Sequence, residues 1–203
     1  MNIYKSILLL ALSVFLSPSA AGVENVTYCD LQTVDGPTFA VDHTLPLFDP
    51  TLGDLVGVDL TVELELVQNY SFENTASDPQ TVDLNTSVEL VVTPPDSGSI
   101  SVGASVLIRE DLAEFDGEED FAGPSGKILM LTNSSSKTIE YPDLSDFVAL
   151  VPGEMISFPA EVTHPGGGTP VPGNLISVAQ GSVRSEVCVT YRYESAVTGE
   201  GGI

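Results

Sequence analysis

The most constraining feature of the sequence is the stretch Val56–Leu66, which alternates apolar and polar residues over eleven positions. Successive side chains leave a β-strand on opposite faces, so this alternation predicts a strand with one face on a core and the other in water. A helix would scatter Asp59, Glu63 and Glu65 around its axis and would gain little from β-branched residues. The stretch therefore predicts an antiparallel sheet with one solvated face.

Shorter segments of the same kind recur along the chain, separated by turns rich in glycine, proline and asparagine. They predict strands at 25–32, 38–44, 56–72, 80–93, 100–108, 127–132, 137–141, 155–162, 175–183 and 186–193, with a hairpin turn at 133–136. The only helix expected is a single turn through Phe147, capped by Asp143. We predict an all-β fold: an antiparallel β-sandwich, jelly-roll or immunoglobulin-like, with about nine strands and minimal helix. An up-and-down barrel is the alternative.

Residues 45–53 contain two prolines and a glycine, which predicts a connection rather than a central strand. We expect its apolar side chains to close one end of the core. These are Leu45, Leu47, Phe48 and Leu52.

The first 21 residues carry the pattern of a secretory signal peptide: Lys5, an apolar run over 7–16, and small residues ending at Ala21. We predict cleavage after Ala21, a single domain over 22–195 and a flexible tail over 196–203. The last residues have no hydrophobic character, so we expect the mature chain to be exported without a membrane anchor. The expected location is extracellular or at the cell surface, or periplasmic in a host with an outer membrane.

The chain is strongly acidic, with 29 Asp and Glu against 6 Lys and Arg and a net charge of -23. Removing Lys5 with the signal peptide gives -23 - 1 = -24 for the mature form. Such a surface repels nucleic acid and anionic lipid, and we expect neither as a partner. It predicts either a soluble, cation-screened surface or a site for divalent cations.

Cys29 and Cys188 are the only cysteines, and they lie in the first and last strand-like segments of the mature chain. In an oxidising compartment they predict a disulfide, with two buried thiols or an intermolecular bridge as alternatives. A zinc site is not expected, because His43 and His164 have no ligand spacing around them.

A concentration of carboxylates at 110–120 is the best candidate for a metal site. Calcium takes six to eight oxygen ligands, and a loop can bring several together, although the EF-hand spacing is absent. A solvated acidic loop is the alternative. The candidate calcium ligands are Asp111, Glu114, Asp116, Glu118 and Asp120.

No catalytic pattern is recognisable in the sequence. A nucleophile elbow of the type G-x-S-x-G and a metalloprotease H-E-x-x-H are both absent, and nothing marks a triad around either histidine. We therefore predict a non-enzymatic protein. Four Asn-x-Ser/Thr sequons are candidate glycosylation sites: Asn25, Asn69, Asn85 and Asn133.

Three motifs resemble the choice-of-anchor E domain family. They are the F-D-P-x-L-G segment at 48–53, the D-F-x-G-P-S-G segment at 120–126 and the closing V-T-Y-x-Y at 189–193. The resemblance spans about Val23 to Ser195 and implies an exported prokaryotic domain attached to the surface by C-terminal sorting signals. It implies no catalytic residue. This sequence departs from the family in its acidity, its two cysteines and its lack of a C-terminal anchor.

These observations predict a non-enzymatic secreted or cell-surface β-sandwich with a structural, matrix or adhesion role. Its expected partners are cell-envelope or matrix components, or further copies of itself through an edge strand. The alternative is an extracellular module that binds calcium or a carbohydrate through the acidic loop.

Overall fold

A computed structural model describes residues 4–6, 22–35, 39–95, 98–163 and 174–195. The first strands of the described part are β1 (Tyr4–Ser6), β2 (Val23–Asp35), β3 (Phe39–Pro46), β4 (Gly53–Asn74) and β5 (Gln80–Val92). They are followed by β6 (Ile100–Leu112), β7 (Gly126–Glu140), β8 (Met155–Thr163) and β9 (Leu175–Ser195). The one helical segment among these residues is a 3-10 turn at Ser145–Phe147, which confirms the expected minimal helix.

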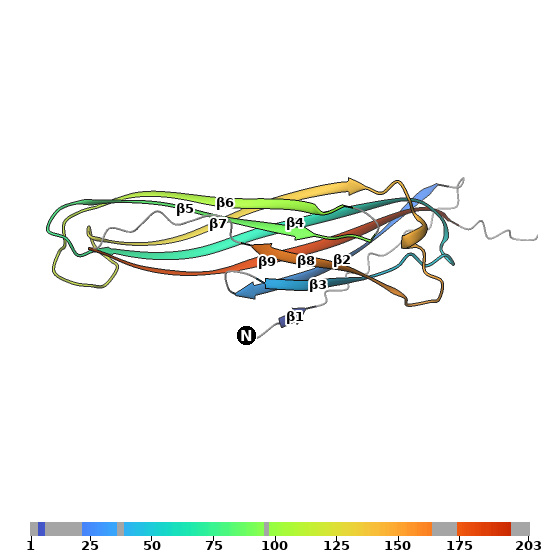
Figure 1. The fold of residues 1–203 in the computed structure, drawn as a ribbon, viewed down its shortest axis with the longest axis horizontal. Helices are drawn as coiled ribbons and strands as arrows, with labels where there is room; N and C mark the ends of the chain where they lie inside the picture. Colours follow the sequence, from blue (N-terminus) through green and yellow to red (C-terminus); the bar gives the residue numbers. More distant parts are fainter. Residues whose placement is uncertain (1–3, 7–21, 36–38, 96–97, 164–173, 196–203) are drawn as a thin grey trace, which may run out of the picture.

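The strands form two antiparallel sheets that pack face to face, as Figure 1 shows. One sheet has the order β1-β2-β9-β4-β7, and the other has the order β3-β8-β5-β6. Apart from the short β1, each sheet contains four strands in the order of a jelly roll, which consists of two Greek keys. The prediction of an antiparallel β-sandwich is confirmed, and the strand order distinguishes a jelly roll from an immunoglobulin-like sandwich or an up-and-down barrel.

The molecule is elongated along its strands (Figure 1) because β4 and β9 contain 22 and 21 residues and pair along almost their whole length. The shorter β2 pairs only with residues 182–194 of β9. One end of the molecule therefore contains β2, β3 and β8 in addition to the long strands, whereas the other end is narrower, with β4, β7 and the start of β9 beside β5 and β6 (Figure 1).

The buried face of β4 matches the apolar–polar alternation of its sequence. Val58, Leu60, Val62, Leu64 and Leu66 are fully buried. Val56 was expected on the same face, but its side chain is 45% exposed. The reason is a register irregularity between Leu55 and Gly57 where β4 pairs with β9, because such a bulge changes which way the next side chain points.

Two breaks between strands that the sequence predicts are absent from the structure. The hairpin expected at 133–136 does not exist, because β7 runs without a break along β4 from Gly126 to Glu140. Likewise, the two closing strands are one strand, β9, in which Gly181 pairs with Gln68. In both places β4 supplies a continuous row of hydrogen-bonding partners, which outweighs the local turn preference of Asn, Ser and Gly.

The connection after β3 closes one end of the core, as predicted. Phe48 is buried between Tyr191 and Tyr193, with ring centroids 5.7 and 5.4 Å away, and the Tyr191 hydroxyl donates to the carbonyl oxygen of Pro46 at 2.8 Å. Leu45 is also buried, and Leu47 packs against the core. Leu52 is 38% exposed, so its predicted place in the core is wrong.

The Asp143 carboxylate accepts hydrogen bonds from the backbone N–H and the hydroxyl of Ser145, at 3.0 and 2.8 Å. These bonds lower the pKa of Asp143. The residue that caps the 3-10 turn is Leu144, one position later than predicted, without a side-chain cap.

Most of the predicted signal peptide, and all of the predicted tail, lie outside the described residues. Within the signal peptide, the backbone of Tyr4–Ser6 pairs with Leu31–Thr33 at the outer edge of β2. Cleavage after Ala21 would remove this short strand and leave β2 as the edge of its sheet. The loop at 164–173, which contains His164, also lies outside the described residues.

Candidate functional site

Four polar side chains lie inside the sandwich, between β2 and β9 of one sheet and β3 of the other. We call Asp30, Gln32, His43 and Ser185 the interior polar cluster. His43 and Ser185 are fully buried, and Asp30 and Gln32 are 6% and 3% exposed. Each occupies an inward position of its strand, in the same rows as Leu45 of β3 and Val187 of β9. Buried polar groups are costly unless they bond to one another, so the cluster must be held by its own contacts.

Three members of the cluster have the arrangement of a Ser–His–Asp triad. The Oγ of Ser185 lies 2.8 Å from Nε2 of His43, and Nδ1 of His43 lies 3.4 Å from Oδ2 of Asp30. Nδ1 makes no aligned hydrogen bond to any described residue, so the Asp30 carboxylate faces it as an electrostatic partner. With its proton on Nδ1, the ring accepts a hydrogen bond from the Ser185 hydroxyl through Nε2, which is the arrangement in which histidine activates a nucleophile.

Burial lowers the pKa of His43 from its ordinary value, and the nearby Asp30 and Asp42 carboxylates oppose this shift without reversing it. The imidazole is therefore neutral at neutral pH and can act as a base toward Ser185.

Gln32 completes the cluster. Its Nε2 donates to both carboxylate oxygens of Asp30 at 3.0 Å, and the backbone N–H of Thr44 donates to Oδ2 at 3.2 Å. Asp30 thus holds the Gln32 amide on one side and faces the His43 ring on the other. Gln32 also borders a cavity of about 450 Å³, which β3, β5 and β8 complete.

No triad pattern is visible in the sequence, because Asp30, His43 and Ser185 come from three separate strands that only the topology brings together. One feature of the sequence does indicate the buried cluster. In β2, Asp30 and Gln32 share the inward parity with Val34, and polar residues in an apolar row indicate a buried polar contact.

The structure does not bring the five predicted calcium ligands together. All five are exposed, and Asp111 lies on strand β6 rather than in the predicted loop. Three of the five carboxylates accept hydrogen bonds from neighbouring residues. Asp116 accepts from the N–H of Glu118 at 3.2 Å, Asp120 accepts from the N–H of Ala122 at 2.9 Å, and Asp111 accepts from Thr81 at 2.6 Å. Within the described ranges, three Cys, His, Asp or Glu ligand atoms lie within 4.8 Å of one another only at Cys29, Glu186 and Cys188, where both sulfurs belong to a disulfide. Calcium binding by this loop stays a prediction.

A buried carboxylate lies beneath the acidic loop. Glu73 is fully buried at the end of β4, and its Oε2 accepts a hydrogen bond from the N–H of Phe121 at 2.7 Å. Its Oε1 and the buried hydroxyl of Ser125 have no hydrogen-bond partner among the described residues. Glu73 therefore fixes the loop to the sandwich and retains one free acceptor.

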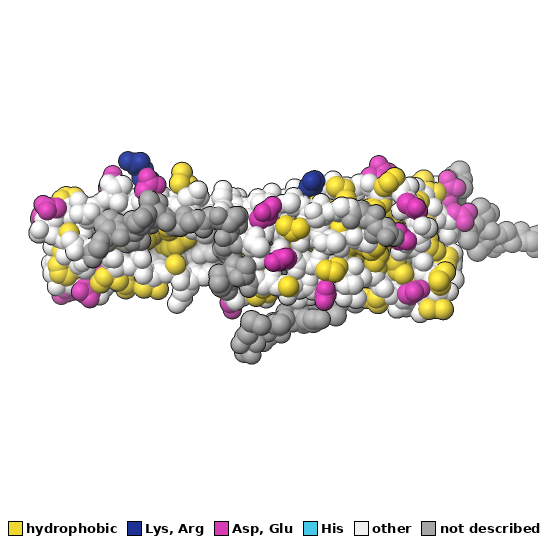
Figure 2. All heavy atoms as spheres, in the orientation of Figure 1, with side chains coloured by type: hydrophobic (Ala, Val, Ile, Leu, Met, Phe, Trp, Pro, Cys, Tyr) yellow, Lys and Arg dark blue, Asp and Glu magenta, His cyan; other side chains and the backbone are white. Residues whose placement is uncertain are grey.

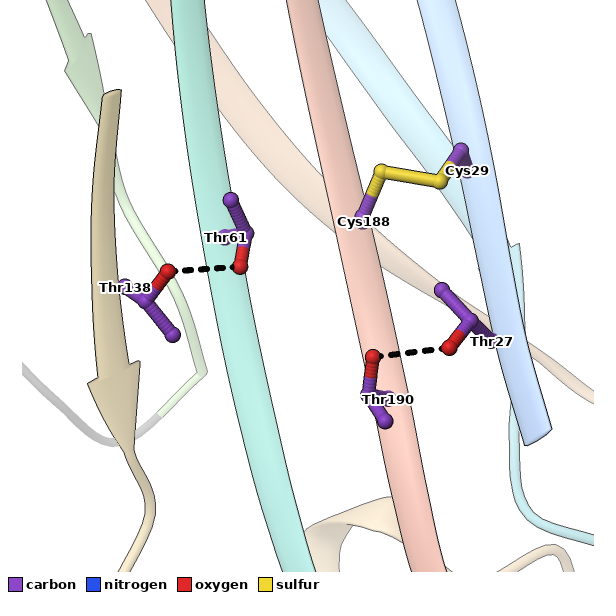
Figure 3. Close-up of a disulfide and its surroundings, with 6 residues drawn as sticks. All are labelled: Thr27, Cys29, Thr61, Thr138, Cys188 and Thr190. Atoms are coloured by element: carbon purple, nitrogen blue, oxygen red, sulfur yellow. Dashed lines mark hydrogen bonds between the residues drawn. A yellow bond between two sulfur atoms is a disulfide. The ribbon is translucent and has the colours of Figure 1, made fainter. Parts of the chain in front are cut away.

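The predicted disulfide between Cys29 and Cys188 is confirmed. The two residues are directly opposite in the β2–β9 pair, on the outer face of the sheet (Figure 3). Beside the disulfide, the hydroxyls of Thr27 and Thr190 are hydrogen-bonded to each other at 2.9 Å (Figure 3). The hydroxyls of Thr61 and Thr138 form the same kind of hydrogen bond between β4 and β7, at 2.8 Å. This face is therefore tied by cross-strand pairs, which stabilise a sheet.

The asparagines of all four sequons, at 25, 69, 85 and 133, lie on strands and are exposed. They are accessible, and their glycosylation stays a prediction. Acidic side chains are spread over the face shown in Figure 2, where basic side chains are few. Arg192 offsets part of this negative charge locally, because its guanidinium contacts both Asp59 and Glu140. None of the helical structure in the described residues is long and apolar enough to span a membrane.

The fold and its cluster define a jelly-roll β-sandwich with a buried Ser–His–Asp arrangement. No protein-family model matches the chain, and no curated protein matches it. Membership of the choice-of-anchor E family therefore stays a prediction.

Among solved structures, the chain is similar to T=1 particles derived from infectious bursal virus, with 14% identity over 96% of this chain and 41% of that one, at a TM-score of 0.22. It is also similar to infectious bursal disease virus strain Gx, with 13% identity over 93% and 42% of the two chains, at a TM-score of 0.17. The chain spans about two fifths of the length of these structures. TM-scores this low carry no inference about function.

Proposed function

We propose that the protein is a non-enzymatic structural component outside the cell, in a matrix, at the cell surface or in adhesion. The observation that carries this proposal is the disulfide between β2 and β9, the first and last strands of the predicted mature domain. Disulfides persist in oxidising compartments, which supports export.

The position of the disulfide suits a protein under mechanical load. The chain enters β2 at Val23, opposite Glu194 near the end of β9, so both ends of the domain lie in one antiparallel pair at the same end of the molecule (Figure 1). Tension on these two ends would open the pair from that end, one residue pair at a time. Six residue pairs, from Val23–Glu194 to Tyr28–Val189, precede the disulfide, and opening would stop there.

The interior polar cluster favours a non-enzymatic protein, despite its resemblance to a triad. A nucleophile must reach the substrate, and the Ser185 side chain has no exposed surface. An external substrate would have to separate the two sheets to reach it.

Two measurements on the source organism test this proposal. Immunolabelling of intact cells should detect the protein at the surface or in the surrounding material, and a deletion strain should lose cohesion or attachment without losing growth. Exclusive recovery from the cytosol would overturn the proposal, and so would a deletion strain with unchanged cohesion and attachment.

The second candidate function is cation binding at the acidic loop, and the free Oε1 of Glu73 beneath the loop favours it. In this proposal Oε1 acts as an inner ligand, and loop carboxylates move toward the cation when it binds. Calcium should then raise the melting temperature, EDTA should reverse the rise, and the double variant Asp116→Asn/Asp120→Asn should lose it. An unchanged rise in that variant would exclude the loop as the site.

A further inference from the structure

We propose that Ser185 and Gln32 are joined inside the sandwich by an ester, which the protein forms itself with loss of ammonia. The bond links Oγ of Ser185 to the side-chain carbonyl carbon of Gln32. His43 acts as the base, and Asp30 positions both His43 and the Gln32 amide. This is an internal modification, and it requires no external substrate.

Strand register places the two reacting side chains side by side. Gln32 of β2 is directly opposite Ser185 of β9, and both side chains point into the core. Residues directly opposite in an antiparallel pair have Cβ atoms about 4.5–5.5 Å apart. A glutamine side chain spans this gap, so its carbonyl carbon can approach a serine Oγ without movement of either strand.

The base, His43, already contacts the nucleophile, Ser185, and Asp30 already binds the amide of Gln32. Nε2 of His43 lies 2.8 Å from the Ser185 Oγ, and both hydrogen bonds from the Gln32 amide nitrogen go to Asp30. Because Asp30 also faces Nδ1 of His43 at 3.4 Å, a single carboxylate restrains the nitrogen that must leave and the ring that must carry the proton. Reacting groups held in this way gain the rate advantage of an intramolecular reaction.

The step balances without a co-reactant. His43 Nε2 takes the Ser185 hydroxyl proton while Oγ attacks the Gln32 carbonyl carbon, giving a tetrahedral intermediate. The carbon–nitrogen bond then breaks, and the nitrogen leaves as ammonia with the proton from His43. One O–H and one C–N bond are replaced by one C–O and one N–H bond, and nothing is oxidised or reduced.

Burial explains why the reaction would stop at the ester. A serine hydrolase completes its cycle when water attacks the acyl-enzyme, but Ser185 and His43 are fully buried. The cavity that Gln32 borders gives ammonia a route out. His43, which would have to activate an attacking water, is fully buried and does not line that cavity. The ester would join the same two strands as the Cys29–Cys188 disulfide, three residues further along and on the opposite face of the sheet, and reductants would not break it.

Intact mass tests the proposal directly. The processed protein should be produced by secretion in a host that attaches no N-glycans, then reduced, alkylated and weighed. The expected result is a mass about 17 Da, one ammonia, below that calculated for the mature sequence with both cysteines alkylated. After reduction, a digest should still contain one peptide that joins the segments around Gln32 and Ser185. A folded protein with the full sequence mass would overturn the proposal, and so would a loss mapped to an asparagine.

Variants and chemistry provide the controls. Ser185→Ala and Gln32→Glu should show no ammonia loss and no joined peptide, whereas Ser182→Ala, in the same strand, should keep both. If the first two variants fail to fold, mild alkali on the denatured wild-type protein decides instead. It should restore about 18 Da as one water and leave Glu at position 32, because esters hydrolyse in alkali much faster than amides. A joined peptide that resists alkali would exclude an ester.

Discussion

His43 is the residue whose ionisation most directly affects stability. Its pKa is lowered in the folded protein by burial, whereas in the unfolded chain it titrates near the ordinary value of 6.5. Below that value the unfolded chain binds a proton that the folded protein resists, so the contribution of neutral His43 is complete above pH 6.5 and is lost as the pH falls toward the folded pKa. We expect the free energy of unfolding to fall with a slope of up to about 1.4 kcal/mol per pH unit from this group.

The measurement is denaturant unfolding of the wild type and of His43→Gln between about pH 7.5 and about pH 5. Acidification also relieves repulsion among the surface carboxylates. The informative quantity is therefore the difference in unfolding free energy between the two proteins, because the contributions of the surface carboxylates and of His164 are the same in both. The advantage of the wild type should shrink as the pH falls. A constant difference over this range would show that His43 titrates alike in the folded and unfolded states.

The β2–β9 pair is the element on which the covalent links act. The disulfide closes a loop of 159 residues, and such a cross-link stabilises by up to about 5 kcal/mol in the chain-entropy model. If the ester is present, it already closes nearly the same loop, and the disulfide then adds little. We therefore expect Cys29→Ser/Cys188→Ser to cost several kcal/mol in a Ser185→Ala background, and much less when Ser185 is intact.

Denaturant unfolding of the four proteins in this cycle measures the coupling between the two links. Ser182→Ala replaces Ser185→Ala in a parallel cycle as the matched control, and it should leave the cost of losing the disulfide at its wild-type value. Equal costs in both Ser185 backgrounds would contradict a second covalent link. A negligible cost in the Ser185→Ala background would contradict stabilisation by the disulfide itself.

Among the strands, the sequence-based predictions are correct where the apolar–polar alternation is long. They are wrong where pairing with β4 outweighs the local turn preference of Asn, Ser and Gly. The parity of 58–66 identified the buried face of β4 correctly, and the positions of the two cysteines predicted their bond. Ser134–Ser136 looked like a turn, yet they lie opposite Glu63–Glu65 because β4 provides partners along its whole length. The interior polar cluster was not predicted, because its residues are far apart in the sequence and meet only where β3 packs over β2 and β9.

For the whole molecule, net charge is the dominant feature. With a formal charge of -23, the folded chain brings carboxylates closer together than the unfolded chain does, and this self-repulsion opposes folding. Salt screens it, since the Debye length falls from about 30 Å at 0.01 M to about 3 Å at 1 M. We expect the melting temperature to rise by several degrees between about 10 mM and about 500 mM NaCl, as measured by calorimetry.

The same calorimetry separates screening from binding. At matched ionic strength, a purely structural protein should melt at the same temperature in calcium chloride as in magnesium chloride, because screening depends on ionic strength and valence and not on the identity of the cation. A further rise in calcium alone, reversed by EDTA, would require a site with the larger and more flexible coordination that calcium prefers. Glu73→Gln is the decisive variant, because it removes the charge of the one buried carboxylate beneath the acidic loop while it keeps the acceptor for the Phe121 N–H. If this variant retained the whole calcium effect, the cation would lie elsewhere on the acidic surface.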